Sequence, residues 1–191
     1  MERINAFPST QTTASLCGLP WQHRLNQNDR VDFRNKILSL DDLPSWRNEL
    51  RNKGRKLVVT NGCFDILHLG HATYLEAARK QGDALLVGVN CDATVRELKG
   101  AGRPVNSEGD RAALIAALAS VDAVCIFHEL RASRFLAIVK PDIYVKGGDY
   151  NVESIPQEER QTVERLGASI VFLPLVPGRS TTSLIERIEK A

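Results

Sequence analysis

The chain has 191 residues, of which 43% are hydrophobic, and this length accommodates one domain with appendages or two very small domains. Its formal charge of +2 and its aromatic content of 6% argue against a nucleic-acid surface, because no run of Lys and Arg is interleaved with aromatic residues. The composition therefore indicates a globular protein that acts on small molecules.

The cysteines and the apolar segments favour a cytoplasmic location. The four cysteines lie far apart and form no CxxC pair, so they predict neither a disulfide framework nor a zinc site. No apolar stretch approaches the roughly 20 residues that span a bilayer. The N-terminus lacks the continuous apolar core of a secretory signal. We therefore expect a reduced, cytoplasmic protein without a membrane partner.

Residues 1–35 differ in composition from the rest of the chain. They are rich in Ser, Thr, Gln and Asn, show no sustained hydrophobic period, and carry scattered Arg with few acidic residues. A transit peptide is a weak alternative, because Glu2, Asp29 and Asp32 count against it. We expect 1–35 to be a flexible or loosely packed tail, and 36–191 to form the functional domain.

The first helix is predicted to begin after Ser39. Ser39 and Asp42 have the spacing of a capping box, and apolar residues follow at helical spacing up to Leu50. Basic residues and Gly54 then end the helix.

Apolar strand-like runs and amphipathic helical segments alternate after this helix. Strands are predicted over 57–60, 84–90, 123–127, 143–145 and 170–173, and helices over 69–81, 110–120, 133–140, 156–166 and 181–190. Continuous apolar strands separated by helices are typical of an α/β protein whose parallel sheet is covered on both faces.

Residues suited to binding polyphosphate follow four of these strands. The segments 61–71, 99–111, 146–150 and 178–182 combine glycines, cations and hydroxyl groups. Because ligands of open α/β sheets bind beyond the carboxyl ends of the strands, we expect these segments to meet at one edge. The sequence therefore predicts a polyphosphate site.

The segment 61–71 is the most specific of the four. Gly62 allows the backbone to approach a ligand, and His68 and His71 lie three residues apart at the start of a helix, so they point to one side. Two imidazoles beside a helix N-terminus can stabilise a phosphate as charge builds in the transition state. The alternatives are ordinary surface histidines, or metal ligation with Asp65. No base is placed to activate Cys63, which we interpret as a packing residue.

The segment before the last predicted helix is the second anchor. Ser180 or Thr181 is placed to cap that helix, and Arg179 stands directly before it. An arginine and hydroxyls at a helix N-terminus form a cradle for phosphate. Taken alone, the same pattern also describes a well-capped terminal helix.

Cations in the other two segments are candidates for phosphate contacts. Lys99, Arg103 and Arg111 follow the second strand, where a glycine-rich loop could close them over a triphosphate, or where they could form a solvated face. Lys146 follows a buried strand directly, where a lysine rarely lacks a partner, and Asp149 is one candidate for that partner.

Two of these motifs carry a resemblance to a known family. The segment 60–71 resembles the first signature of the HxGH nucleotidyltransferase superfamily, and 178–182 resembles its second. The residues of 58–65, 99–111 and 145–150 are most similar to the adenylyltransferase domain of ADP-heptose synthase. The likeness covers about 36–188 and implies a Rossmann-like, doubly wound sheet of five parallel strands.

The resemblance implies AMP transfer from ATP to D-glycero-D-manno-heptose 1-phosphate, with Mg²⁺ on the phosphates and no covalent intermediate. It implies catalytic roles for His68, His71, Lys99 and Arg111, and substrate contacts by Asp65 and Asp149. The nucleotide would be bound by Thr60, Asn61, Gly62, Cys63, Phe64, Lys146, Gly147, Arg179, Ser180, Thr181 and Thr182. No protein ligand to a metal is predicted.

The resemblance also implies a homodimer that binds ATP and a small sugar or polyol phosphate, and no nucleic acid. Most such domains are fused to a sugar kinase, for which the upstream segment is too short, so the kinase is expected elsewhere. A cytidylyltransferase acting on glycerol 3-phosphate and a nucleotide-binding regulator without turnover remain alternatives. An oxidoreductase is disfavoured, because the first loop lacks GxGxxG.

Overall fold

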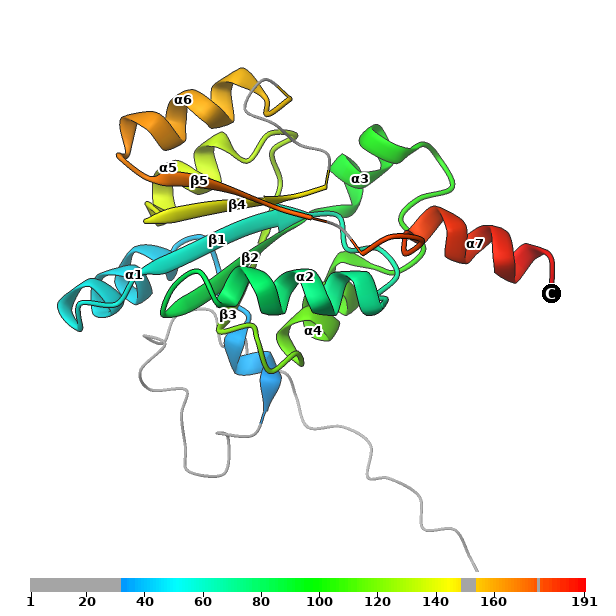
Figure 1. The fold of residues 1–191 in the computed structure, drawn as a ribbon, viewed down its shortest axis with the longest axis horizontal. Helices are drawn as coiled ribbons and strands as arrows, with labels where there is room; N and C mark the ends of the chain where they lie inside the picture. Colours follow the sequence, from blue (N-terminus) through cyan, green and yellow to red (C-terminus); the bar gives the residue numbers. More distant parts are fainter. Residues whose placement is uncertain (1–31, 149–153, 175) are drawn as a thin grey trace, which may run out of the picture.

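A computed structural model describes residues 32–148, 154–174 and 176–191 of the chain. Its centre is one sheet of five strands in the order β3-β2-β1-β4-β5, and every pair is parallel (Figure 1). The strands are β1 (Leu57–Gly62), β2 (Ala84–Asn90), β3 (Ala123–Phe127), β4 (Ile143–Gly147) and β5 (Ser169–Leu173). The predicted five-stranded parallel sheet is therefore confirmed.

Helices precede the first strand and follow each of the five strands along the chain. They are η3 (Phe33–Lys36, a 3-10 helix), α1 (Leu43–Asn52), α2 (Leu69–Arg79), α3 (Asp92–Lys99), α4 (Glu108–Ala116), α5 (Ser133–Val139), α6 (Gln157–Arg165) and α7 (Thr181–Glu189). In the described part of the chain, none of them is long and apolar enough to cross a membrane.

Two apolar clusters show that the sheet is covered on both faces. On one face, the buried Val59 of β1 packs with leucines of α1, Phe135 of α5 and Val163 of α6. On the other face, Val58 of β1 packs with Leu75 of α2 and with apolar residues of α4. Successive strand residues point to opposite faces, so both layers are built from one apolar run.

The strand order reverses between β1 and β4, and the two strands separate there. Their register holds only at Val58 with Ile143 and at Val59 with Tyr144. The β1–β2 register continues to Gly62. The ladder between β1 and β4 therefore ends well before their carboxyl ends, which opens the sheet at the point where doubly wound folds bind ligands.

The main departure from the predicted elements is α3. The segment after β2 was expected to be a loop, but Asp92–Lys99 is helical and ends at Gly100, whose φ is +97°. Thr94 and Val95 are its buried residues, and its eight residues are fewer than the roughly 11–18 over which helical periodicity is read.

The folded domain begins inside the predicted tail. The helix η3 starts at Phe33, and the Lys36 ammonium donates to the carbonyl of Leu118 at 3.1 Å. The backbone N–H of Leu38 donates to the carbonyl of Val124 at 2.8 Å, beside β3. Residues 1–31 lie outside the described part of the chain.

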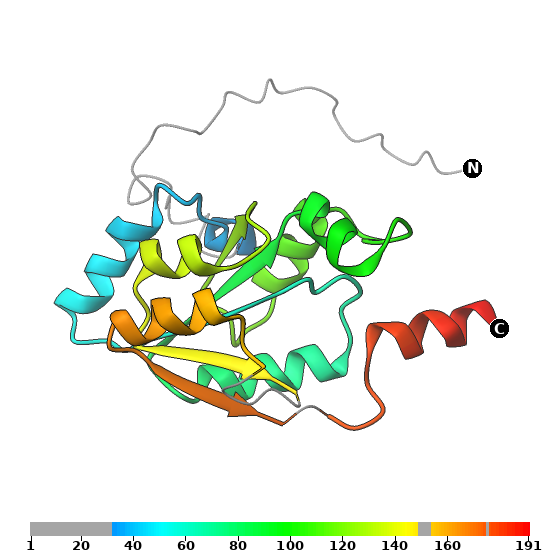
Figure 2. The same cartoon turned by 90° about the horizontal axis from the view of Figure 1, so that it is seen from above.

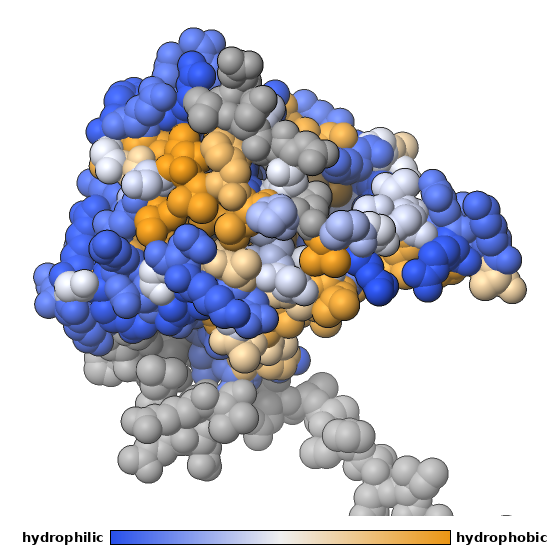
Figure 3. Space-filling view, in the orientation of Figure 1, coloured by the Kyte–Doolittle hydropathy of each residue, from blue (hydrophilic) through white to orange (hydrophobic). Residues whose placement is uncertain are grey.

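Two surface features stand out, one beyond the carboxyl edge of the sheet and one over β5. The last helix, α7, extends away from the body of the domain in both ribbon views (Figures 1 and 2). Apolar surface lies over β5 (Figure 3), where Ile170 to Leu173 are only partly buried because β5 is an edge strand.

Candidate active site

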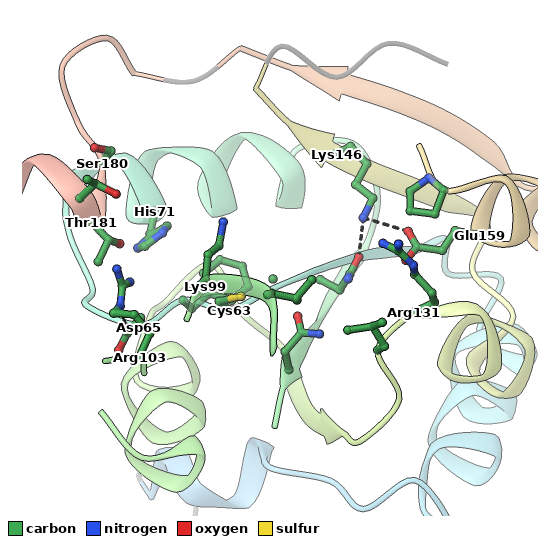
Figure 4. Close-up of a pocket in the computed structure, with 18 residues that line it drawn as sticks. Cys63, Asp65, His71, Lys99, Arg103, Arg131, Lys146, Glu159, Ser180 and Thr181 are labelled. Atoms are coloured by element: carbon green, nitrogen blue, oxygen red, sulfur yellow. Dashed lines mark hydrogen bonds and ion pairs between the residues drawn. The ribbon is translucent and has the colours of Figure 1, made fainter. Parts of the chain in front are cut away.

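A cavity of about 450 Å³ opens at the carboxyl edge of the sheet (Figure 4). It collects residues from all four predicted segments: Asn61, Gly62, Cys63, Phe64, Asp65, His71, Lys99, Lys146, Ser180, Thr181 and Thr182 line its wall. Parallel strands bring these segments together although more than a hundred residues separate the first from the last. The predicted convergence on one edge is therefore observed.

A second cavity of about 190 Å³ adjoins the first at the start of α7. It is lined by His68 and Arg179, and it shares His71, Ser180 and Thr181 with the larger cavity. Thr60, Gly147 and Arg111 are not among the residues that line these two cavities. Thr60 is buried, and its hydroxyl is 2.7 Å from the Tyr74 hydroxyl. Asp149 lies outside the described residues.

The two histidines form a stacked pair at the start of α2. The ring centroids of His68 and His71 are 3.8 Å apart with an interplanar angle of 19°. Nδ1 of each ring is buried and has no hydrogen-bond partner in the described ranges. Phe64, whose φ is +46°, places its ring edge-on to His71 at 5.2 Å. A bulky residue adopts this conformation only where its surroundings fix it, as they often do at functional sites.

Gly70 is the residue that lets this pair form. A Cβ at this position would lie 2.9 Å from Cε1 of His68 and 3.1 Å from Cβ of Arg179. The sequence showed Gly70 between the histidines, but its steric role depends on Arg179, which arrives from the other end of the chain.

Both imidazoles are biased toward the neutral form. Burial lowers the pKa of His71 to about 4; the neighbouring His68 lowers it further, and hydrogen bonding to the backbone of Ile66 acts in the opposite direction. Burial and the charge of Arg179 also lower the pKa of His68. An anion bound beside the two rings would favour the protonated forms, because an opposite charge raises the pKa of an imidazole.

The N-terminus of α7 completes the same end of the cavity. Ser180 is the N-cap, and its hydroxyl accepts from the backbone N–H of Ser183 at 3.1 Å, in a capping box. This confirms the predicted cap. Helix geometry leaves the amides of the first turn, at Thr181 and Thr182, without intrahelical acceptors, and the helix dipole favours an anion there.

Arg111 does not reach the cavity wall. Its side chain is fully buried, and its guanidinium donates to the carbonyls of Cys63, Asn90 and Asn106 and to the carboxylate of Asp92. The predicted phosphate contact would require Arg111 to abandon these partners. The structure instead gives it the role of joining the loop after β1, the end of β2 and the starts of α3 and α4.

Asp65 also has partners within the chain. Its carboxylate, 2% exposed, accepts from Nε of Arg103 and from the backbone N–H groups of Val105 and Asn106. Burial raises the pKa of Asp65, but these hydrogen bonds outweigh burial and hold the pKa below its ordinary value. The predicted substrate contact of this carboxylate therefore gains no support, whereas Arg103, beside it, lines the cavity.

Cys63 has the properties of a packing residue, as predicted. Burial is the main cause that raises the pKa of its thiol, against the lowering effect of Lys99 and Arg111. A protonated thiol is a poor nucleophile. Its carbonyl group, by contrast, accepts from Arg111 and helps to fix the loop.

The residue that sequence reasoning missed is Glu159. Its carboxylate, on α6, lies 3.1 Å from the ammonium of Lys146 and accepts from the Tyr144 hydroxyl at 2.9 Å and from the N–H of Ala132 at 3.0 Å. Lys146 was expected to have a partner, and Asp149 was the candidate. Only the packing of α6 against the sheet reveals Glu159, because the sequence places it among other helical glutamates.

Comparison with known proteins identifies the class of this site. Residues 59–187 match the family model described as Cytidylyltransferase-like, and the chain belongs to this family. It is therefore a nucleotidyltransferase, as the two signature segments predicted.

Individual relatives give a more specific comparison than the family model does. The bifunctional protein HldE of Pseudomonas paraeruginosa is 50% identical over 154 residues, which are 81% of this chain and 32% of that protein. The bifunctional protein HldE of Syntrophotalea carbinolica is 42% identical over 166 residues, or 87% and 34% of the two chains. The chain thus spans about a third of the length of these curated relatives.

Two solved structures share the fold. The lipopolysaccharide core biosynthesis protein of Thermoplasma volcanium GSS1 is 36% identical, with a TM-score of 0.53 over 64% of this chain and 98% of that one. The pantoate-beta-alanine ligase of Francisella tularensis is 16% identical, with a TM-score of 0.51 over 79% and 72%, and this likeness concerns the fold alone.

Proposed function

We propose that the protein transfers AMP from ATP to D-glycero-D-manno-heptose 1-phosphate and releases pyrophosphate. The observation that carries the proposal is the stacked pair of His68 and His71, which faces the N-terminus of α7 across adjoining cavities. This arrangement suits a polyphosphate whose charge increases during reaction. The choice of the heptose rests on the similarity to the HldE proteins and on the resemblance of 145–150 to the heptose branch.

The proposed chemistry is one in-line displacement. A phosphate oxygen of the sugar phosphate attacks the α-phosphorus of ATP, the bond from that phosphorus to the bridging oxygen breaks, and pyrophosphate leaves with the electron pair. His68 and His71 donate hydrogen bonds to the oxygens that gain charge, and the amides of Thr181 and Thr182 hold the leaving pyrophosphate. Lys99 lies on the cavity wall beside them (Figure 4). Positioning and electrostatics supply the rate.

Magnesium is proposed to enter with the nucleotide. Among the described residues, no group of three His, Cys, Asp or Glu side chains could hold a metal ion. Mg²⁺ is commonly bound through substrate phosphates, with few protein ligands. MgATP is therefore the proposed substrate, and the chain itself contributes the cations that line the cavity.

The test is pyrophosphate release by the purified chain with Mg²⁺. ATP or CTP is offered with heptose 1-phosphate or with glycerol 3-phosphate. We expect release with ATP and the heptose only. Release with CTP and glycerol 3-phosphate only would overturn the substrate assignment and keep the mechanism. The absence of release in all four combinations would favour a regulator that binds nucleotide without turnover.

The His68→Ala variant connects the assay to the site. We expect its turnover to fall by roughly 100- to 1,000-fold, the range measured for removing one transition-state donor. Unchanged turnover would remove His68 from the mechanism.

A further inference from the structure

The end of the cavity away from α7 is built by four polar side chains that the mechanism does not use. Asn61 of β1, Tyr144 and Lys146 of β4, and Glu159 of α6 are joined by hydrogen bonds, and we refer to them as the polar network. Figure 4 shows Lys146 and Glu159 at one end of the cavity and Ser180, Thr181 and His71 at the other. The network occupies the gap where β1 and β4 separate.

The polar network fixes the orientation of the Asn61 amide. The Lys146 ammonium donates to Oδ1 of Asn61 at 2.9 Å, and the Tyr144 hydroxyl, 2.6 Å from the same atom, shares its single proton between Asn61 and Glu159. An ammonium can only donate, so its partner is the amide oxygen, and the other end of the amide is the NH₂ group. That group makes no hydrogen bond to the described residues, and it is not enclosed by them. It therefore offers two donors toward the cavity.

Glu159 holds the two residues that orient Asn61. Its carboxylate, 3% exposed, binds both the Tyr144 hydroxyl and the Lys146 ammonium. A buried carboxylate beside a buried ammonium compensates its charge, so of the two cations on this wall, Lys146 and Arg131, the charge of Arg131 remains (Figure 4). The opposite end has the N-terminus of α7 and Lys99, beside Arg103, which is paired with Asp65, and the helix N-terminus draws the phosphates of a substrate there.

We propose that the Asn61 amide, oriented by Tyr144 and Lys146 and through them by Glu159, binds the hydroxyl groups of a substrate's uncharged part. Asn61 is then a specificity-determining residue, and Glu159 is a positioning residue. The ribose of the nucleotide and the acceptor sugar share this hydroxyl chemistry. Sites built to bind a hydroxyl discriminate strongly against analogues that lack it, because their polar groups are left unpaired. The inference deepens the proposed function and rests on it for the substrates.

The Asn61→Asp variant tests the donor role. Aspartate keeps the oxygen that Tyr144 and Lys146 bind and replaces the NH₂ group by an acceptor. We expect KM to rise by about tenfold or more for one substrate, as for the loss of a hydrogen bond, with kcat reduced much less. A rise for ATP, with lost preference for ATP over 2′,3′-dideoxy-ATP, identifies the ribose. A rise for the sugar phosphate identifies the sugar.

The Glu159→Gln variant tests positioning. Glutamine can still accept from the Tyr144 hydroxyl but no longer carries the charge that pairs with Lys146, so the same KM is expected to rise less than in Asn61→Asp. Glu164→Gln, the same change on an exposed residue of α6, is the matched control. Far-UV circular dichroism and thermal unfolding establish that all three variants are folded.

Two outcomes would overturn the inference. One is that both KM values of folded Asn61→Asp stay within twofold of wild type. The other is that kcat of Asn61→Asp falls while both of its KM values stay unchanged. If the wild-type chain releases no pyrophosphate, the proposed function fails, and calorimetric titration with ATP and with sugar phosphate replaces KM. Equal affinities of wild type and Asn61→Asp for both ligands would then overturn the inference itself.

Discussion

At the scale of single residues, the site depends on close approach between groups that are distant in sequence. Gly70 separates the imidazole of His68 from Arg179, and a methyl group there would lie 2.9 Å from the ring. Distances below about 3 Å to a Cβ require the neighbour to move, so the histidine or the start of α7 must shift. Displacement by about one ångström is enough to lower a rate substantially when catalysis depends on positioning.

The Gly70→Ala variant is therefore expected to lose turnover while it stays folded. Alanine is favoured over glycine inside a helix by about 1 kcal/mol, which offsets part of the steric cost. We expect kcat to fall by roughly tenfold to a hundredfold, comparable to misplacing one catalytic group. Steady-state kinetics and thermal unfolding measure the two effects.

Gly109→Ala provides the control for this prediction. Gly109 lies in α4, where a new Cβ would meet its nearest atom at 3.9 Å, an ordinary contact. Its turnover should match wild type. Equal turnover of Gly70→Ala and Gly109→Ala would show that the spacing at His68 is unimportant.

At the scale of elements, Arg111 joins the segments that carry the site. Its guanidinium binds carbonyls in the loop after β1 and at the end of β2, together with the carboxylate of Asp92 at the start of α3. Lysine has no planar fork and cannot make these contacts together. Removing one partner of such a buried set leaves polar groups unpaired, which is strongly destabilising.

The Arg111→Lys variant should accordingly lose stability. We expect a loss of about 3–5 kcal/mol in the free energy of unfolding, measured with urea. Arg96→Lys, an exposed change on α3, should leave stability unchanged. A variant of normal stability with a raised KM for ATP would instead support the phosphate contact first expected for Arg111.

At the scale of the whole molecule, the domain is a sheet with two apolar layers whose strands separate at the point where the order reverses. The segment before α1 belongs to this body. Leu38 is buried in one layer, and Phe33 and Ile37 pack against the other. Lys36 also bonds to the carbonyl of Leu118. The folded domain therefore includes Phe33, earlier than the residue-36 boundary expected from composition.

Two truncations test this boundary. Removing 1–31 should leave turnover and the melting temperature close to wild type. Removing 1–38 should lower the melting temperature by several degrees, because it exposes apolar surface and removes the hydrogen bonds to Leu118 and Val124. Equal melting temperatures of the two truncated chains would show that 32–38 contributes nothing to stability.

Much of the fold followed from local patterns in the sequence. The strands 84–90 and 123–127 were predicted at their observed bounds, because each is a short, largely apolar run with β-branched residues, bounded by polar residues. The start of α7 and its Ser180 cap were also predicted, since capping depends on residues within one turn. The spacing of His68 and His71 likewise indicated a binding site at the start of α2, and these two residues line the cavities beside α7.

Other features depended on partners that no local pattern specifies. The sequence offered Arg103 and Arg111 as equivalent cations, and only packing buried one and left the other on the cavity wall. Glu159 and Lys146 are paired because α6 packs beside β4. The sequence by itself determined the order of the strands and of most helices, and the segments that line the cavity, because their signals are local. Tertiary structure decided which charges are buried and paired, because desolvation and pairing depend on the whole surroundings of a group.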